Sequence, residues 1–407
     1  MNTPFFQKRI LLGVTGSIAA YKAADLASKL AQSGAQVDVI LTQAATQFIT
    51  PLTFQSVTGQ RAWIDADLWG AQGHVLHIGL GHSADLLVVA PASANTIARL
   101  ANGIADNLLS LTALVANCPL VIAPAMDGGM YQHPATQANL ETLRQRGAIL
   151  LGPASGHLAS GLSGVGRMLE PAEILGHLRH LLGNSGPMQG KTVVVTAGGT
   201  QEPIDPVRAI SNRSSGKQGF ALAQAALDLG AQVILITAPT ALPTPVGATR
   251  VEVNTADEML HAVEQAVRNA DVLLMAAAVA DFRPVTAADH KIKKETGIPQ
   301  IYLEKTSDIL SVIASQRSAT GYPRFMVGFA AESEDLLENA RSKIQSKHLD
   351  MIVANDISAA DSGFAVDDNR VTLLDSLGGV EELPLQNKAE VAATILQRVV
   401  VGLSNLG

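Results

Sequence analysis

The sequence predicts an α/β fold with two doubly wound domains, Rossmann-like or flavodoxin-like, whose sheets are largely parallel. Continuous apolar segments such as 84–95 and 270–281 alternate with helical segments. This pattern is typical of parallel strands that are covered on both faces. Two helical segments end in SGAQV and LGAQV, which places a glycine at the helix end directly before the next buried strand.

The two halves of the chain open in the same way. In the first half, the strand 9–14 leads through the glycine turn TGS into a helix, and a second strand covers 35–42. In the second half, the strand 191–196 leads through AGGT to a helix, and the next strand covers 231–237. Each half is therefore expected to begin as a βαβ unit of a parallel sheet.

A boundary between the halves is predicted near residues 182–190. A chain of 407 residues is too long for one ordinary hydrophobic core, so two domains are expected. The stretch LGNSGPMQG is rich in turn-forming residues and has no apolar periodicity. We expect one domain at 1–186 and the other at 187–407.

The composition restricts the possible partners and the cellular location. The net charge is −7, which argues against a nucleic-acid-binding or membrane-surface protein because those need a basic face. Cys118 is the single cysteine, which excludes an intrachain disulfide and a cysteine-rich metal site. The apolar run after Lys8 and Arg9 is too short for a signal peptide, and no segment has the roughly 18 apolar residues of a membrane helix. A cytoplasmic protein is expected.

Two loops of the first half can bind an anion. TGSIAAYK places backbone N–H groups and the Ser17 hydroxyl, next to Gly16, at a helix N-terminus directly after a strand. PASANT follows a later strand and offers Ser93, Asn95 and Thr96. The first loop is equally consistent with a plain tight turn, and the second with simple N-capping. The spacing is not that of the dinucleotide fingerprint G-x-G-x-x-G.

The stretch SNRSSGKQG in the second half is not a P-loop. That motif requires glycine at the position of Ser211 and serine or threonine at the position of Gln218. A loop of small residues that opens a helix remains, and its backbone N–H groups can still hold a phosphate.

Several basic residues have simple structural interpretations when they are considered alone. His77 is then best interpreted as a packed or surface histidine. Lys291, in HKIKKE, is typical of a solvated charged loop. Lys343 and Lys347 are four residues apart and fit an exposed helix face.

The longer motifs change this interpretation. GSIAAYK, PASANT, PAM-x-x-x-M, GRMLEP, AGGTQEPIDPVRAISNRSSGKQG, AAAVADF, KIKK and GFAAE together cover nearly the whole chain. The chain resembles the bifunctional proteins of coenzyme A biosynthesis, in which a phosphopantothenoylcysteine decarboxylase is joined to a phosphopantothenate–cysteine ligase.

For the first half, the resemblance implies an FMN-binding, trimer-forming decarboxylase. In this family the flavin oxidises the substrate thiol to a thioaldehyde, which lets the adjacent carboxylate leave as carbon dioxide. Reduction of the resulting ene-thiol gives 4′-phosphopantetheine. His77 matches the essential histidine, which can assist proton movement near neutral pH. The expected flavin contacts are Gly16, Ser17, Thr42, Ser93, Asn95 and Thr96.

Two residues depart from the decarboxylase motifs. Asp127 replaces an asparagine whose amide donates to the substrate carboxylate, and an ionised aspartate can only accept hydrogen bonds. At about 4 Å and an effective dielectric constant near 20, the repulsion is of order 4 kcal/mol, or about a thousandfold in rate. Only a protonated Asp127 restores a donor. Ser160 replaces a cysteine that acts as an acid, and a hydroxyl is a far weaker acid than a thiol. The decarboxylation step is therefore expected to be impaired.

For the second half, the resemblance implies a ligase that uses CTP. CTP activates the carboxylate of 4′-phosphopantothenate as an acyl-cytidylate, which the amine of cysteine then attacks, and Mg²⁺ accompanies the triphosphate. Lys291 is the implied catalytic lysine, whereas Asn212 and Arg208 are tied to the acyl-cytidylate and its turnover. Ser307 departs from a usual proline. The implied nucleotide contacts are Ala276, Ala277, Asp281, Lys291, Ser307, Asp308, Ile309, Leu310, Phe329, Lys343 and Lys347.

The resemblance also implies an assembly. The lysine loop reaches a neighbouring copy in relatives, so a shared dimeric ligase site is expected, and dimers combined with trimers give a homododecamer. Two alternatives remain open at this point. One is a ligase whose first half only binds flavin, and the other is a non-catalytic regulatory subunit that binds flavin and nucleotide. No metal ligands are assigned.

Overall fold

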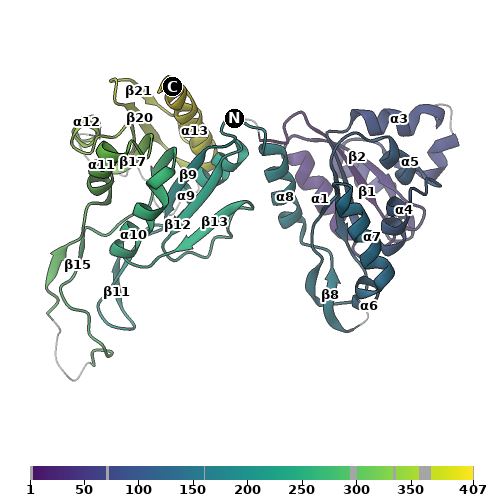
Figure 1. Cartoon of the computed structure of the whole chain (residues 1–407), viewed down its shortest axis with the longest axis horizontal. Coiled ribbons are helices and arrows are strands. Elements are labelled where there is room, and N and C mark those ends of the chain that lie inside the picture. The colour runs from purple at the N-terminus through teal and green to yellow at the C-terminus, as the bar shows by residue number, and fades with distance from the viewer. Residues whose placement is uncertain are drawn as a thin grey trace. The chain divides into compact units, whose positions relative to one another are not determined.

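The computed structural model describes residues 3–69, 73–159, 161–293, 300–332, 336–356 and 368–406. The chain divides into two compact units, Asn2–Leu182 and Gly183–Gly407 (Figure 1). The division lies at the start of the turn-rich stretch 182–190. Among the residues described, none of the helices combines the length and the apolar character that a membrane crossing needs.

The N-terminal unit is built on a parallel sheet with the order β3-β2-β1-β4-β5-β6. The register pairs Ile10 with Val37 on one side and with Leu86 on the other. The strand order reverses between β1 and β4, and this switch point is where doubly wound sheets bind ligands. The strands are β1 (Arg9–Val14), β2 (Gln36–Leu41), β3 (Ala62–Ile64), β4 (Leu86–Ala92), β5 (Leu120–Pro124) and β6 (Ile149–Leu150).

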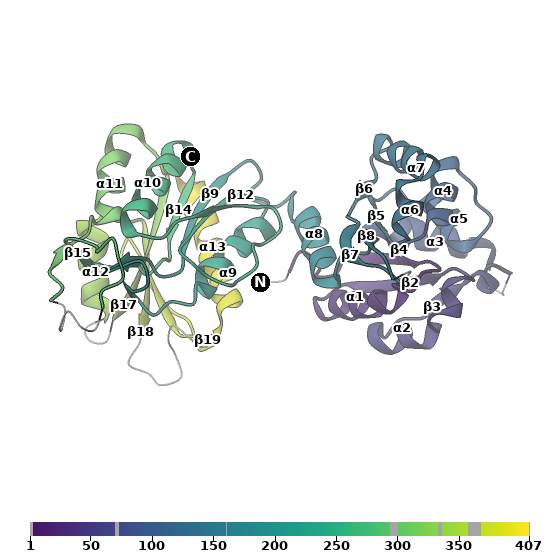
Figure 2. The same cartoon turned by 90° about the horizontal axis from the view of Figure 1, so that it is seen from below.

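Helices cover both faces of this sheet (Figure 2). Leu26 of α1, Phe54 of α2 and Ile174 of α8 are buried against one face. Ile97 of α4 and Leu140 of α7 are buried against the other face. The helices are α1 (Ala20–Gln32), α2 (Pro51–Thr58), α3 (Gly73–Ser83), α4 (Ala94–Asn102), α5 (Leu108–Val115), α6 (Gly128–Gln132), α7 (Pro134–Gln145) and α8 (Pro171–Gly183).

An antiparallel hairpin, β7 (Ala154–His157) and β8 (Ser163–Arg167), lies beside the end of β5. The N–H of Met126 donates to the carbonyl oxygen of Gly166 at 3.0 Å. A Cβ atom at Gly166 would lie only 2.2 Å from the carbonyl oxygen of Met126, so this close approach requires glycine. The sequence analysis did not predict this hairpin.

The sheet of the C-terminal unit has the order β13-β12-β9-β14-β17-β18-β20-β21. From β13 to β18 the strands are parallel and repeat the order of the first unit, whereas β20 and β21 are antiparallel. The strands are β9 (Thr192–Ala197), β12 (Gln232–Thr237), β13 (Ala248–Glu252), β14 (Val272–Met275), β17 (Phe325–Glu332), β18 (Met351–Asp356), β20 (Val371–Asp375) and β21 (Val380–Glu382). The predicted largely parallel, doubly wound architecture is confirmed.

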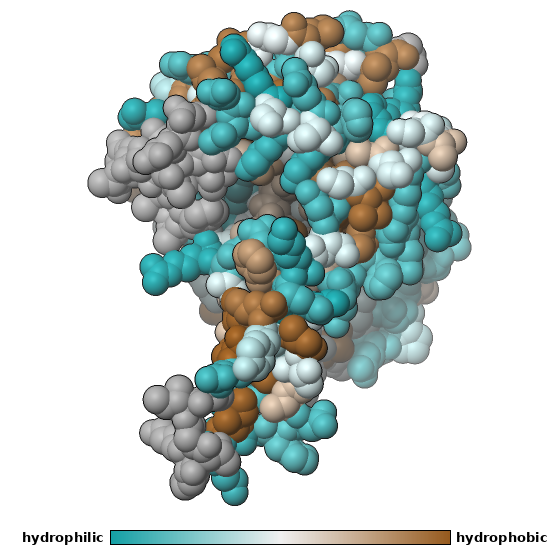
Figure 3. All heavy atoms as spheres, turned by 90° about the vertical axis from the view of Figure 1, so that its left-hand side faces the viewer, coloured by the Kyte–Doolittle hydropathy of each residue, from teal (hydrophilic) through white to brown (hydrophobic). Residues whose placement is uncertain are grey.

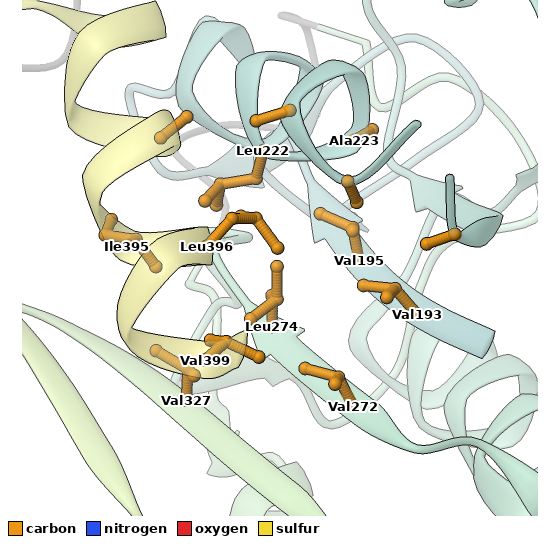
Figure 4. Close-up of a cluster of buried hydrophobic side chains, with 14 of the residues drawn as sticks. Val193, Val195, Leu222, Ala223, Val272, Leu274, Val327, Ile395, Leu396 and Val399 are labelled. Atoms are coloured by element: carbon orange, nitrogen blue, oxygen red, sulfur yellow. The ribbon is translucent and has the colours of Figure 1, made fainter. Parts of the chain in front are cut away.

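One face of this sheet is covered by α9 and α13, as Figure 4 shows. There Leu222 of α9 and Leu396 of α13 pack with Val195 and Leu274 of the central strands. The other face is covered by α10, α11 and α12. The helices are α9 (Lys217–Asp228), α10 (Ala256–Ala266), α11 (Ile309–Thr320), α12 (Leu336–Ser346) and α13 (Lys388–Asn405).

Two small antiparallel sheets extend from the C-terminal unit (Figure 1). They pair β10 (Gln201–Pro203) with β11 (Ala209–Ser211) and β15 (Phe282–Pro284) with β16 (Leu303–Lys305). We call β15, β16 and the adjoining residues Val285, Ile301 and Tyr302 the arm. Apolar surface is visible along it in Figure 3. Its exposed apolar side chains are Phe282, Val285, Ile301, Tyr302 and Leu303. A third small sheet pairs β19 (Asp368–Asn369) with β22 (Gln386–Asn387).

Candidate functional site

In the N-terminal unit, the loops predicted to contact flavin meet at the switch point of the sheet. The Thr15 hydroxyl donates to the carbonyl oxygen of Pro91 at 2.7 Å and accepts from the N–H of Ser93 at 2.9 Å. A Cβ atom at Gly16 would lie 2.6 Å from the Cβ of Ala44, so the loops after β1 and β2 also touch. The structure therefore brings Gly16, Ser17, Thr42 and the Ser93–Thr96 segment to one end of the sheet.

The two helix starts at this place differ in their capping. Helix α4 is capped by Ser93, whose Oγ accepts from the N–H of Thr96 at 3.4 Å. Helix α1 has no side-chain cap at its N-cap residue Ala19. The N-terminus of a helix is positively polarised and suits a phosphate. These residues fit a phosphorylated flavin such as FMN.

A cavity of about 470 Å³ opens next to these loops. It brings Ser17 of the predicted flavin loop together with Asp127, which follows β5. His157 and Arg167 of the hairpin also line it, as does Lys22 of α1. The cavity therefore carries groups of both charges beside the predicted flavin loop.

Asp127 has a local structural role that the sequence analysis missed. It is the N-cap of α6, and its Oδ1 accepts from the N–H of Gly129 at 2.9 Å. Aspartate and asparagine are equally good N-caps because each offers a side-chain oxygen. Capping alone therefore explains why either residue type can stand here.

Lys22 is a buried cation at the edge of the same cavity. Its Nζ lies 2.7 Å from Glu170 Oε1 and donates to the carbonyl oxygen of Met168 at 3.4 Å. The hydrogen bond from Lys22, together with the charges of Lys22 and Arg167, holds the pKa of Glu170 below its usual range, although partial burial works in the opposite direction. This pair ties α1 to the residues that follow the hairpin.

Of the other two decarboxylase residues, the structure describes only His77. His77 lies on α3, which packs against α5, and it does not line the cavity. Its buried Nδ1 has no hydrogen-bond partner within the described part of the chain. Ser160 lies outside the described residues, although its neighbour Ala159 lines the cavity.

In the C-terminal unit, the AAAVAD segment after β14 is fastened to the turn after β9. The N–H of Ala277 donates to Thr196 Oγ1 at 3.1 Å, and that of Ala280 donates to Thr200 Oγ1 at 2.9 Å. The Asn212 amide donates to the carbonyl oxygen of Val279 at 2.9 Å. Asn212 thus holds the predicted nucleotide-binding segment from the side.

Two adjoining cavities, of about 320 and 440 Å³, lie along this segment. Both are lined by Ala277, Val279, Asp281, Phe329 and Lys343. The smaller cavity also includes Asn212 and Ala276. The larger cavity adds five further predicted contacts, which are Ser307, Asp308, Ile309, Leu310 and Lys347.

Two of these residues form an ion pair. Lys347 Nζ lies 3.0 Å from Asp308 Oδ2. Burial raises the pKa of Asp308, but hydrogen bonds from Lys347 and Ser311 outweigh it and leave the pKa below the usual value. Asp308 also caps α11 by accepting from the N–H of Ser311 at 3.2 Å.

Lys291 and Arg208 do not line either cavity. Lys291 is exposed, in the chain between β15 and β16. Arg208 forms a salt bridge with Asp205, which holds the pKa of the Asp205 carboxyl far below its usual range. Within one chain, Lys291 therefore lies apart from the other implied nucleotide contacts.

Comparison with known proteins identifies the family. Residues 3–183 match the family described as Flavoprotein, and residues 188–403 match the DNA/pantothenate metabolism flavoprotein C-terminal domain. The chain is 44% identical over 395 residues to the coenzyme A biosynthesis bifunctional protein CoaBC of Bacillus subtilis (strain 168), covering 96% of each chain. The chain belongs to this bifunctional family.

One further relative and two solved structures are also similar to this chain. The CoaBC of Vibrio vulnificus (strain CMCP6) is 44% identical, and the alignment covers 96% of this chain and 97% of that protein. A crystal structure of the C-terminal domain of a CoaBC protein is 42% identical and covers 54% of this chain and all of that one, with a TM-score of 0.46. A structure titled FMN-dependent cysteine decarboxylase SpaF is 31% identical and covers 44% of this chain and 97% of that one, with a TM-score of 0.38.

The smaller cavity also contains polar residues that the sequence analysis did not identify as site residues. In the smaller cavity, Lys388 is 7% exposed and Asn369 is 5% exposed. Buried side-chain oxygens of Gln218, Asn355 and Asn369 have no partner in the residues that the structure describes. No local sequence pattern marks these residues as part of a site. The segment NKAE, which contains Lys388, predicts only the capping box that Asn387 and Glu390 form at α13.

The described residues supply no cluster of metal ligands. Among the described residues, no group of three or more histidine, cysteine, aspartate or glutamate side chains could hold a metal ion. Asp281 is the acidic residue that lines both cavities next to the nucleotide segment.

Proposed function

We propose that this chain catalyses two consecutive steps of coenzyme A biosynthesis. The C-terminal unit ligates 4′-phosphopantothenate with cysteine through an acyl-cytidylate formed from CTP, and the N-terminal unit decarboxylates the product. The observation that carries the proposal is that relatives named as bifunctional match 96% of the chain, across both units. This favours a bifunctional enzyme over a ligase with an inert flavin-binding half and over a non-catalytic subunit.

The two adjoining cavities suit the ligation. CTP would occupy the larger one, between Phe329 and the residues Ser307–Leu310, with Lys343 and Lys347 near its phosphates. Phosphopantothenate would extend into the smaller one, where Lys388 and the start of α9 can meet its phosphate. The α-phosphate of CTP and the carboxylate would then meet beside the residues that both cavities share.

For the decarboxylation, FMN would be held by Gly16, Ser17, Thr42, Ser93, Asn95 and Thr96. The flavin supplies the oxidation of the substrate thiol. The substrate would enter the adjoining cavity, where Lys22 and Arg167 provide positive charge and Asp127 caps α6. An ionised Asp127 would repel the carboxylate that leaves, and Ser160 is a weak acid, so the step would be slower than with asparagine and cysteine at these positions.

The proposal also includes the oligomeric assembly, the Mg²⁺ requirement and the cellular location. The exposed apolar arm would pair two ligase units, so that Lys291 of one copy reaches the cavities of the other. Trimers of the N-terminal unit combined with these dimers would give a homododecamer. Mg²⁺ would accompany CTP, and the protein would act in the cytoplasm, where its small-molecule substrates are found.

Product analysis tests the function. The purified protein is incubated with phosphopantothenate, CTP and cysteine, and we expect pyrophosphate, phosphopantothenoylcysteine and then phosphopantetheine. Accumulation of phosphopantothenoylcysteine alone would support the ligase activity and refute the decarboxylase activity. The matched control is the doubly substituted protein, Asp127→Asn with Ser160→Cys. Absence of CTP-dependent product would refute the ligase.

A further inference from the structure

The segment that carries Lys291 is held by a buried carboxylate. The Asp205 side chain, between β10 and β11, has 0% exposed surface. Its Oδ2 accepts from the N–H of Ile292 at 3.2 Å, and its Oδ1 accepts from the N–H groups of Val207 and Arg208, each at 2.9 Å. A carboxylate that accepts this many hydrogen bonds is fixed in position and kept ionised.

Arg208 also holds Ile292, and we call the hydrogen bonds of Asp205 and Arg208 to Ile292 the grip. Its Nε donates to Asp205 Oδ2 at 3.0 Å, and its Nη2 donates to the carbonyl oxygen of Ile292 at 3.1 Å. Both backbone polar groups of Ile292 are therefore bound. A second fastening lies just upstream, where the N–H of Ala288 donates to the carbonyl oxygen of Ile204 at 2.9 Å. Lys291 lies between these anchors, with its side chain exposed.

We propose that Asp205 and Arg208 are positioning residues for Lys291. They fix the backbone next to the lysine while its side chain reaches outward, and Arg208 acts through this grip rather than by contact with the reacting atoms. The role of Lys291 rests on the proposed function, whereas the grip itself does not. The geometry explains why an arginine outside both cavities would matter for the ligase reaction.

Limited trypsin digestion of the full-length protein tests the grip independently of activity. In Asp205→Ala, cleavage after Lys291 and Lys293 should be about tenfold faster, because charge-assisted hydrogen bonds to the segment are lost. Asp205→Asn, which keeps one acceptor oxygen, should lie between this variant and the wild type. The control is Glu304→Gln, which removes an ion pair with Arg283 in the arm and should leave cleavage at these lysines unchanged. An unchanged cleavage rate in both Asp205 variants would overturn the proposal.

A double-mutant cycle tests the positioning role in catalysis. Asp205→Ala should lower kcat for pyrophosphate release about tenfold or more while KM for CTP stays within about twofold, since the other CTP contacts lie elsewhere. In a Lys291→Gln background the same substitution should have little further effect. Effects that multiply independently would contradict the proposal. Wild-type protein without ligase activity would refute the proposed function, and the digestion would still decide whether the grip exists.

Discussion

Lys347 Nζ lies 3.0 Å from Asp308 Oδ2, so two residues that the sequence assigns to the nucleotide site neutralise each other. Lys347 is 26% exposed and Asp308 is 48% exposed, which leaves the pair open to solvent at the rim of the larger cavity. The charge that CTP meets at this rim therefore depends on both residues together.

Lys347→Met should weaken CTP binding more than removal of one cation alone would, because it also unmasks the Asp308 carboxylate. We expect about a tenfold loss of affinity, in line with a charge-assisted contact. Isothermal titration with CTP measures this loss. Adding Asp308→Asn should restore part of the affinity, and a double variant that binds as weakly as the single one would contradict the explanation.

Lys291→Gln should abolish most of the pyrophosphate release, because a lysine ammonium is lost from the triphosphate transition state. Asn212→Asp should instead let the acyl-cytidylate accumulate, as the resemblance implies for its turnover. Quenched-flow analysis of the intermediate distinguishes the two variants. If pyrophosphate release proved insensitive to Lys291, its catalytic assignment would be wrong.

Asp127 can be tested as a cap and as a charge in separate measurements. Asp127→Ala should lower the unfolding free energy of the N-terminal unit by about 1 kcal/mol, whereas Asp127→Asn should change it little, because it keeps the capping oxygen. Fluorescence reports on this unit, since both tryptophans, Trp63 and Trp69, lie in it. In a decarboxylation assay, Asp127→Asn should be faster than wild type, and an equal or lower rate would show that the carboxylate does not oppose the reaction.

The Lys22–Glu170 pair predicts a pH dependence. The folded-state pKa of Glu170 lies below its unfolded value of about 4.3, so its stabilising contribution is present above that pH and is lost as the pH falls through the folded-state pKa. Since Glu170 is 54% exposed, solvent screening limits this contribution to about 1 kcal/mol or less. Urea unfolding should therefore distinguish wild type from Glu170→Gln at about pH 6, and the two stabilities should converge once the pH has fallen below the folded-state pKa of Glu170. A difference that grew on acidification would contradict this assignment.

The sequence predicted the parallel strands because these are continuous buried apolar segments. The strands β1, β4 and β14 lie within the predicted ranges, and β9 ends one residue beyond its range. The antiparallel elements were missed. They are short, and the β7–β8 hairpin is placed beside the end of β5 by a contact between Gly166 and Met126, which lie far apart in the sequence.

The same reason explains the site residues that were missed. The motifs before β14 and after it mark Asn212 and Ala276–Asp281, which lie close together in the structure. Asn369 and Lys388 reach the same cavity only because the chain returns through the antiparallel edge of the sheet and α13. The sequence around Lys388 encodes a helix start, whereas Asn369 lies on the short strand β19, and no single-sequence pattern shows which cavity either element approaches.

The arm gives a prediction about assembly. Four apolar side chains of the arm expose between 42% and 72% of their surface, and they are Phe282, Ile301, Tyr302 and Leu303. Exposed apolar side chains that lie this close together are typical of an interaction site. Ile301→Asp combined with Leu303→Lys should weaken self-association, because charges in an apolar interface lose hydration without gaining partners. Sedimentation velocity should show a smaller particle, with trimers retained if the N-terminal units associate separately. The control is Leu377→Asp, at a 93% exposed leucine on the turn between β20 and β21, and it should leave the sedimentation coefficient unchanged. An assembly that persists unchanged in the arm variant would assign the pairing of ligase units to another surface.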